Sequence, residues 1–218
     1  MRFSNTASYY HLLEDFLIGS ALQRTRLAQL NIPLLDETKA HVLIVGEGNG
    51  RFLSVLLRQY PRLCITVIDE SAAMLDRAQA RLEMAGLNCD NVTFRVADFL
   101  AVELPSTHFS LIVTHFFFSN FIEADVERMV RKLSDAASQN VQWLLGDFVL
   151  PGGGIYRLRA KIWLWILYRF FGWTAAVPVR VLPNVESHLT RCGFECRAEA
   201  FYCGRLLRSA CYRRIPGY

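Results

Sequence analysis

The residues that decide the fold are His41-Val42-Leu43-Ile44-Val45-Gly46-Glu47-Gly48-Asn49-Gly50-Arg51-Phe52-Leu53. An apolar run ends in three alternating glycines and then becomes amphipathic, which predicts a buried parallel strand, a tight turn and the start of a helix. Glycine permits a positive φ and lets a ligand approach the backbone, and a helix start offers free N–H groups. The segment therefore predicts a turn that holds a nucleotide or nucleoside cofactor.

The spacing of the glycines narrows the choice of cofactor. A dinucleotide fingerprint needs G-x-G-x-x-G, but Arg51 stands where the third glycine would be, and no phosphate-loop motif is present. The G-x-G-x-G of Gly46 to Gly50 resembles the first motif of class I S-adenosylmethionine-dependent methyltransferases. The family usually has an acidic residue where this chain has Ile44. In the family, that acid helps to hold the glycine turn and the methionine end of the cofactor. Glu47, inside the turn, is expected to take over part of this role.

Four further segments match this family in the expected order. Asp69-Glu70-Ser71-Ala72-Ala73-Met74-Leu75 resembles its D-x-S-x-x-M-L segment and follows a predicted strand. An acidic residue after the second strand can accept hydrogen bonds from both ribose hydroxyls. Further strands are predicted over 91–96, 109–114 and 141–145, and they lead into Asp98-Phe99, His115 and Asp147. The resemblance covers about residues 40–150.

The alternation of predicted strands and helices indicates an α/β fold. The resemblance implies a Rossmann-like, doubly wound, seven-stranded sheet with the strand order 3-2-1-4-5-7-6. A short helix over 184–191, with Asn184 as cap, and a hairpin of strands over 194–201 and 205–213 are predicted to complete it. We expect one domain over 1–218, with an N-terminal helical lid over 1–35 and a helical cap inserted at 152–183.

Composition narrows the function classes. The chain has 218 residues, of which 52% are hydrophobic and 20% charged, so one globular domain with a sizeable core is expected. Six cysteines without a C-x-x-C pair, and no secretory signal, predict reduced thiols, a cytoplasmic location and no metal. The net charge of +4 comes from scattered arginines with no basic run beyond Arg213-Arg214, which argues against a nucleic-acid partner.

The resemblance implies a set of cofactor contacts. The cofactor would be S-adenosyl-L-methionine, with S-adenosyl-L-homocysteine as product. The glycines would approach the methionine and ribose part, Asp69 would hold the ribose, and Asp98 with Phe99 would recognise adenine. The full expected set is Tyr10, Gly46, Glu47, Gly48, Gly50, Asp69, Glu70, Met74, Asp98, Phe99 and His115. Arg26 could meet the cofactor carboxylate, although a solvated arginine is the simpler interpretation.

Two residues are candidates for catalysis. His115, with an ordinary pKa near 6.5, could act as a general base, or it could bond a backbone carbonyl or line the cofactor site. Asp147 follows the fifth strand and could face the pocket, or it could order a loop. Either residue would orient or deprotonate the acceptor.

The segment Ile155–Trp173 is the best clue to the acceptor because it is too aromatic for a solvent-facing helix. It could roof an apolar small-molecule site, pack in a homodimer interface, or lie in a membrane surface. The candidate substrate contacts are Phe116, Phe117, Tyr156, Trp165 and Tyr168.

The sequence therefore predicts methyl transfer to an apolar or aromatic small molecule, with an oxygen acceptor favoured. The chain would act as a monomer or homodimer, with peripheral membrane contact as an open alternative. Two other functions remain open: a non-catalytic, methyltransferase-like scaffold subunit, suggested by Ile44, and an NAD(P)-dependent oxidoreductase, which Arg51 and Asp98-Phe99 disfavour.

Overall fold

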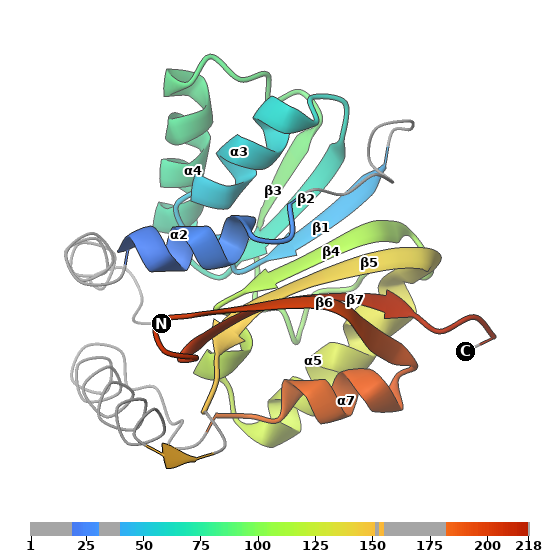
Figure 1. Ribbon diagram of the computed structural model, residues 1–218. Coiled ribbons are helices and arrows are strands. Elements are labelled where there is room, and N and C mark those ends of the chain that lie inside the picture. Colours follow the sequence, from blue (N-terminus) through green and yellow to red (C-terminus); the bar gives the residue numbers. More distant parts are fainter. Residues whose placement is uncertain (1–18, 31–39, 151–152, 155–181, 218) are drawn as a thin grey trace.

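The computed structural model describes residues 19–30, 40–150, 153–154 and 182–217, and a seven-stranded sheet runs through its centre (Figure 1). The strands are β1 (His41–Val45), β2 (Cys64–Asp69), β3 (Val92–Val96), β4 (Phe109–His115), β5 (Ala137–Phe148), β6 (Phe194–Tyr202) and β7 (Leu207–Arg214). Their order in the sheet is β3-β2-β1-β4-β5-β7-β6, which confirms the predicted topology. The first five strands are parallel, and β7 runs antiparallel to both of its neighbours.

Helices cover both faces of the sheet (Figure 1). One face carries α2 (Gly19–Leu27), α3 (Arg51–Gln59) and α4 (Ala72–Met84), and the other carries α5 (Glu123–Ala136) and α7 (Val185–Arg191). A single 3-10 turn, η3 (Phe118–Asn120), follows β4. The strand order reverses at β1, so the carboxyl ends of β1 and β4 border the crevice where open α/β sheets bind ligands.

Local chemistry sets the starts of two helices. The Ser71 hydroxyl accepts the Met74 N–H at 3.4 Å and so caps α4. The Asn184 side chain accepts the Ser187 N–H at 3.2 Å, which confirms the cap predicted there. Gly193, with φ of 77°, lies just beyond the end of α7. The ends of α7 therefore follow from short-range signals in its sequence.

Two apolar layers hold the helices to the sheet. Alternate residues of β1 divide between them: Leu43 and Val45 pack toward α5, whereas Val42 and Ile44 pack toward α3. All four are essentially without solvent exposure. Burial of each such side chain contributes about 1.5–3 kcal/mol to the stability of the fold.

The fifth strand begins earlier than predicted. The sequence indicated a strand from Val141, but β5 starts at Ala137, directly after α5 ends at Ala136. The polar residues Gln139 and Asn140 lie on this early part of the strand and are exposed. The pairing of β4 with β5 shifts register between Phe109 and Leu111, which accommodates this extension.

Two predicted elements lie mostly or wholly outside the described residues. The helical lid over 1–35 is described only at α2 and the few residues after it, and the aromatic segment 155–173 is not described. Within the described ranges, no helix combines the length and apolar character needed to cross a bilayer.

Candidate functional site

The glycine turn joins the carboxyl end of β1 to α3, and its three glycines all have positive φ: 70° at Gly46, 69° at Gly48 and 78° at Gly50. A Cβ on Gly46 would lie 2.8 Å from Cδ2 of Phe117, and one on Gly50 would lie 2.7 Å from Cα of Ala78. A Cβ on Gly48 would meet nothing within 4 Å. The outer two glycines are therefore required by packing, whereas Gly48 leaves bare backbone beside open space, as a closely approaching ligand needs.

Asp69 ties this turn to the end of β2. Its Oδ2 accepts the Gly48 N–H at 3.2 Å, and its Oδ1 accepts the Ser71 N–H at 2.9 Å. Burial raises the pKa of the Asp69 carboxyl, and the two backbone hydrogen bonds oppose that shift. Asp69 therefore lies beside the glycine turn, and its contact with a ribose stays a prediction.

Two more acids gather at this edge of the sheet. The pKa of Glu70 is raised, first by burial and then by the negative charges of Asp69 and Asp98. Asp98 is exposed, and its Oδ1 accepts the Leu100 N–H at 2.9 Å. Three acidic groups at the ends of β2 and β3 favour a ligand that is cationic or rich in hydroxyl donors.

The other predicted cofactor contacts lie around these acids. Phe99 is buried, and its ring meets that of Phe117 edge to face with 5.7 Å between centroids. Met74 is half-buried in the first turn of α4. Phe117 in turn lies directly beneath Gly46, so these aromatic rings form the floor under the glycine turn.

Glu47 points to the start of α3. Its Oε1 accepts the N–H groups of Phe52 at 3.0 Å and Leu53 at 2.9 Å, because the capping position, Gly50, has no side chain. Burial raises the pKa of Glu47 to about 7, although these bonds and the charge of Arg26 lower it. Ile44 is 1% exposed and belongs to the apolar layer under α3. The carboxylate of this turn thus comes from position 47 and serves the helix N-terminus.

His115, at the end of β4, is buried beneath α2 and α3. Its ring packs edge to face on Phe52, with 4.7 Å between centroids, and closely approaches Gly146. Burial and the neighbouring charge of Arg26 lower its pKa to about 3. The expectation of an ordinary pKa near 6.5 is therefore wrong, because the imidazole is enclosed by apolar groups. Its Nδ1 is buried and has no hydrogen-bond partner among the described residues.

Asp147, near the end of β5, is also buried. Its Oδ1 accepts the Phe148 N–H at 2.8 Å and its Oδ2 accepts the Ser119 N–H at 3.2 Å. Burial raises its pKa to about 6 despite these bonds. It borders a cavity of about 110 Å³ whose lining also includes Arg208 and Glu186.

The structure does not bring the two catalytic candidates to one face. Side chains alternate along parallel strands, and His115 pairs in register with Gly146, one residue before Asp147. His115 accordingly packs on Phe52 of α3, while Asp147 bonds η3 on the opposite face. The two residues therefore occupy separate environments with different pKa values.

The turn after β4 depends on one residue that sequence reasoning missed, Asn120. Phe116 has φ of 55°, which is unusual for a non-glycine residue. The Asn120 amide donates to the carbonyls of Phe116 at 2.9 Å and Phe117 at 3.1 Å and so fixes this conformation. Arg26 is half-buried, and its guanidinium carbon lies over the Phe116 ring at 5.3 Å from the centroid. The Asn120 bonds had no sequence signal beyond the residue type.

Some predicted contacts cannot be placed. Tyr10, Tyr156, Trp165 and Tyr168 lie outside the described residues. Within the part of the chain that is described, no group of three or more His, Cys, Asp or Glu side chains is arranged to hold a metal.

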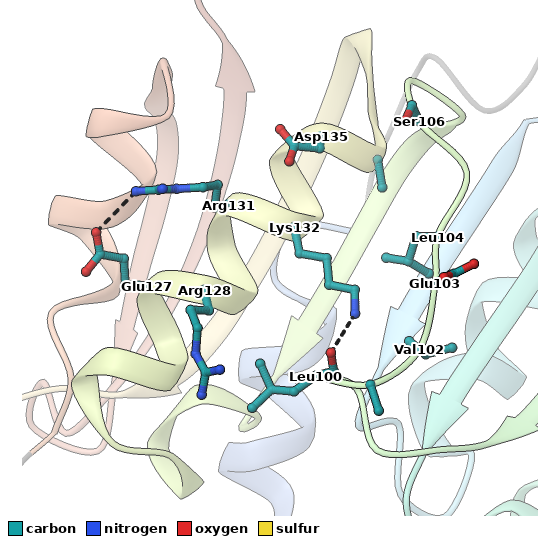
Figure 2. A pocket seen from close by; sticks show the side chains of 12 residues that line it. Leu100, Val102, Glu103, Leu104, Ser106, Glu127, Arg128, Arg131, Lys132 and Asp135 are labelled. Atoms are coloured by element: carbon teal, nitrogen blue, oxygen red, sulfur yellow. Dashed lines mark hydrogen bonds and ion pairs between the residues drawn. The ribbon is translucent and has the colours of Figure 1, made fainter.

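A wide groove of about 710 Å³ runs between α5 and the segment 100–106 (Figure 2). The Lys132 side chain reaches across from α5 to Leu100 (Figure 2) and donates to the carbonyls of Phe99 at 2.9 Å and Leu100 at 3.0 Å. Neither the glycine turn nor Asp69, Asp98, His115 or Asp147 lines this groove. The candidate site is instead the carboxyl edge of β1, β2 and β4.

Comparison with known proteins agrees with this geometry. Residues 42–140 match the family model described as a methyltransferase domain. The malonyl-[acyl-carrier protein] O-methyltransferase of Paenibacillus sp. (strain JDR-2) is 34% identical over 106 residues, which are 45% of this chain and 38% of that protein. The chain spans only 32–43% of the length of the curated relatives it matches.

Two solved structures share the fold. An O-methyltransferase family 2 protein from Planctomyces limnophilus, in complex with apigenin, has a TM-score of 0.73 at 15% identity, covering 99% of this chain and 62% of its own. Magnesium protoporphyrin IX methyltransferase from Synechocystis, with bound S-adenosylhomocysteine, has a TM-score of 0.66 at 16% identity, covering 91% and 85%. The TM-scores show a common fold, and at such low sequence identity the likeness shows the fold alone.

Proposed function

Since this chain belongs to the class I S-adenosylmethionine-dependent methyltransferases, we propose that it transfers a methyl group from S-adenosylmethionine to an apolar or aromatic small molecule, with oxygen as the acceptor atom. The observation that carries the proposal is the bare backbone of Gly48, which faces open space while its N–H is held by Asp69. A nucleoside can approach closely there, and the Asp69 carboxylate stands within reach of its sugar.

The described residues fit this cofactor. Gly46 to Gly50 would lie along its methionine and ribose part, Asp69 would accept the ribose hydroxyls, and Asp98 would accept the adenine amino group. The acidic groups at the ends of β2 and β3 complement a ligand that carries a positive charge. When bound, the cofactor supplies an activated methyl group on a sulfonium. The protein then has to align the acceptor, exclude water and remove a proton.

The two buried titratable groups receive different roles in this proposal. A histidine with a pKa of about 3 is neutral at physiological pH and is a weak base, so His115 is assigned to the packing around the cofactor site and not to proton removal. Asp147, with a pKa of about 6, is ionised yet still basic near neutral pH. We therefore assign proton removal to Asp147.

The acceptor is proposed to lie across the carboxyl ends of β4 and β5, with Asp147 on the η3 side and aromatic side chains on the α2 side. Phe116 and Phe148 lie with 5.3 Å between ring centroids and pack with Ala21 of α2. Tyr156, Trp165 and Tyr168 are proposed to complete this apolar surface, with Phe117 at its base. Relatives named as O-methyltransferases, one of them in complex with apigenin, support an oxygen acceptor and an aromatic substrate.

Calorimetric titration with S-adenosylhomocysteine tests the cofactor assignment. We expect one site on the wild type and about tenfold or greater weakening in Asp69→Asn, because a charged hydrogen-bond acceptor is lost. Absence of binding, together with a stable complex with another protein, would favour the scaffold alternative.

The base assignment is tested by turnover at saturating cofactor on a panel of phenols, quinones and lipids. Asp147→Asn should lower kcat by about 100-fold and abolish a pH dependence near 6, whereas His115→Gln should change affinity for the cofactor more than kcat. Full kcat in Asp147→Asn would show that catalysis relies on positioning alone.

A further inference from the structure

A second groove lies behind the glycine turn, bordered by α2, α3 and α4. Its volume is about 500 Å³, and its lining consists of Gln23, Arg51, Ser54, Val55, Arg58, Arg81, Met84 and Ala85. Three of these eight residues are arginines and none is acidic. This composition stands out in a chain whose 24 basic residues are nearly balanced by 20 acidic ones.

The helix geometry spreads the arginines over two walls of the groove. Arg51 and Arg58 are seven residues apart on α3, so they share one face and are separated by about two turns, or roughly 10 Å. Arg81 comes from the last turn of α4, which packs against the glycine turn through Ala78. A ligand between the two helices would therefore meet guanidinium groups from both sides.

The charges of two of these arginines are not neutralised within the described part of the chain. No carboxylate among the described residues forms an ion pair with Arg58 or Arg81. Guanidinium groups bind phosphate oxygens through paired, charge-assisted hydrogen bonds. The groove thus has the chemistry of a phosphate site and lacks the acids that would repel one.

Arg81 also connects the groove to the cofactor turn. Its Nε donates to the carbonyl of Asn49 at 2.8 Å, and Asn49 lies between Gly48 and Gly50. That bond uses only Nε, so the two terminal nitrogens remain on the same planar group as donors. One side chain can therefore hold the turn and a ligand at the same time.

We propose that this groove binds a soluble anion carrying two or more phosphate groups, and that Arg81 couples its occupancy to cofactor binding. A diphosphate held by the terminal nitrogens restrains the Arg81 side chain, so the bond to Asn49 forms more often and the turn is better ordered. Because such coupling is reciprocal, bound cofactor strengthens diphosphate binding by the same factor. The binding site itself does not depend on methyl transfer.

Calorimetry of the full chain with inorganic pyrophosphate, with and without S-adenosylhomocysteine, tests the proposal. Wild type should bind pyrophosphate, and Arg58→Gln should weaken that binding about tenfold while leaving nucleoside affinity unchanged. Arg81→Gln should weaken pyrophosphate binding, and pyrophosphate should no longer change the affinity of this variant for S-adenosylhomocysteine. The matched control is Arg62→Gln, which removes the same charge just beyond α3 but outside the groove, and it should bind like wild type.

Several results would overturn the proposal. One is the absence of any binding heat when pyrophosphate is added to the wild type. Another is an equal loss of pyrophosphate affinity in Arg62→Gln and Arg58→Gln, which would indicate a general charge effect. Arg58-dependent sedimentation with phosphatidylglycerol vesicles, without pyrophosphate binding, would also overturn it and assign the phosphate to a lipid. A wild type that binds pyrophosphate but not S-adenosylhomocysteine would instead refute the proposed methyltransferase function and leave the anion site standing.

Discussion

Three glycines with nearly the same positive φ contribute differently to the cofactor turn. Gly46 and Gly50 allow Phe117 and Ala78 to press against the backbone, whereas Gly48 faces open space. Substitution at Gly48 therefore introduces backbone strain alone, while substitution at Gly50 adds a steric clash. Comparing substitutions at Gly48 and Gly50 therefore separates backbone strain from steric clash within one turn.

We expect Gly50→Ala to lower the free energy of unfolding by about 2–5 kcal/mol, because its Cβ would lie 2.7 Å from the backbone of α4. Gly48→Ala, the matched control, should cost about 1–2 kcal/mol for the positive φ alone. Urea denaturation measures both values. Equal losses would contradict the packing role of Gly50.

The protonation of Glu47 should make stability depend on pH. Its pKa rises from 4.5 to about 7 on burial, so the folded state binds a proton more tightly than the unfolded state. The resulting stabilisation is complete below about pH 4.5 and is lost as the pH rises through 7, a change on the order of 3 kcal/mol. Urea denaturation between pH 4.5 and 8 checks this decline.

Glu47→Gln is the matched variant because it keeps a capping oxygen without a titrating group. The decline between pH 6 and 7 should then disappear. The decline below pH 6 should become smaller without vanishing, because burial also raises the pKa of Asp147, to about 6. An unchanged slope in this variant would show that Glu47 stays ionised in the folded protein.

At the scale of elements, side chains at strand and helix ends hold the site together. Glu47 caps α3, Ser71 caps α4 and Asp69 joins β2 to the glycine turn. The turn after β4 depends on Asn120, whose amide bonds two consecutive carbonyls. Since Phe117 of this turn lies beneath Gly46, its conformation also supports the cofactor turn.

Replacing Asn120 with alanine should lower the free energy of unfolding by about 1–3 kcal/mol, because the Phe116 and Phe117 carbonyls lose the side-chain amide that fixes this turn. Nucleoside affinity should fall as well, since Phe117 would no longer be fixed under Gly46. Asn88→Ala provides the control, because the amide of Asn88 bonds Asp90 in an exposed turn. If the two variants lost equal stability, Asn120 would be an ordinary turn residue.

At the scale of the whole molecule, the site is assembled from segments spread over much of the chain. The glycine turn, Asp69, Asp98 and His115 meet only because their strands are neighbours in the sheet. A ligand bound there contacts the folded state alone and must stabilise it.

S-adenosylhomocysteine at about 100 times its Kd should stabilise the fold by about 2.7 kcal/mol, which raises the unfolding midpoint by roughly 5–10 °C. NAD⁺ at the same concentration should leave the midpoint unchanged. Thermal unfolding followed by circular dichroism provides the measurement. A shift with NAD⁺ and none with S-adenosylhomocysteine would favour the oxidoreductase alternative.

Much of the architecture was determined by the sequence alone. The glycine spacing, the Ser71 and Asn184 caps and the alternation of strands with helices are short-range signals, because each depends on residues within one turn or one strand–helix unit. The strand order followed from the family resemblance that these signals supported. The acids at the ends of β2 and β3 were found in the same way.

Only the tertiary structure decided the surroundings of the titratable side chains at the site. It placed His115 and Asp147 on opposite sides of the sheet, with pKa values of about 3 and about 6. It also brought Arg81 to Asn49, 32 residues away in the chain. Burial and electrostatic environment depend on which distant segments pack together, so no local pattern in the sequence contains them.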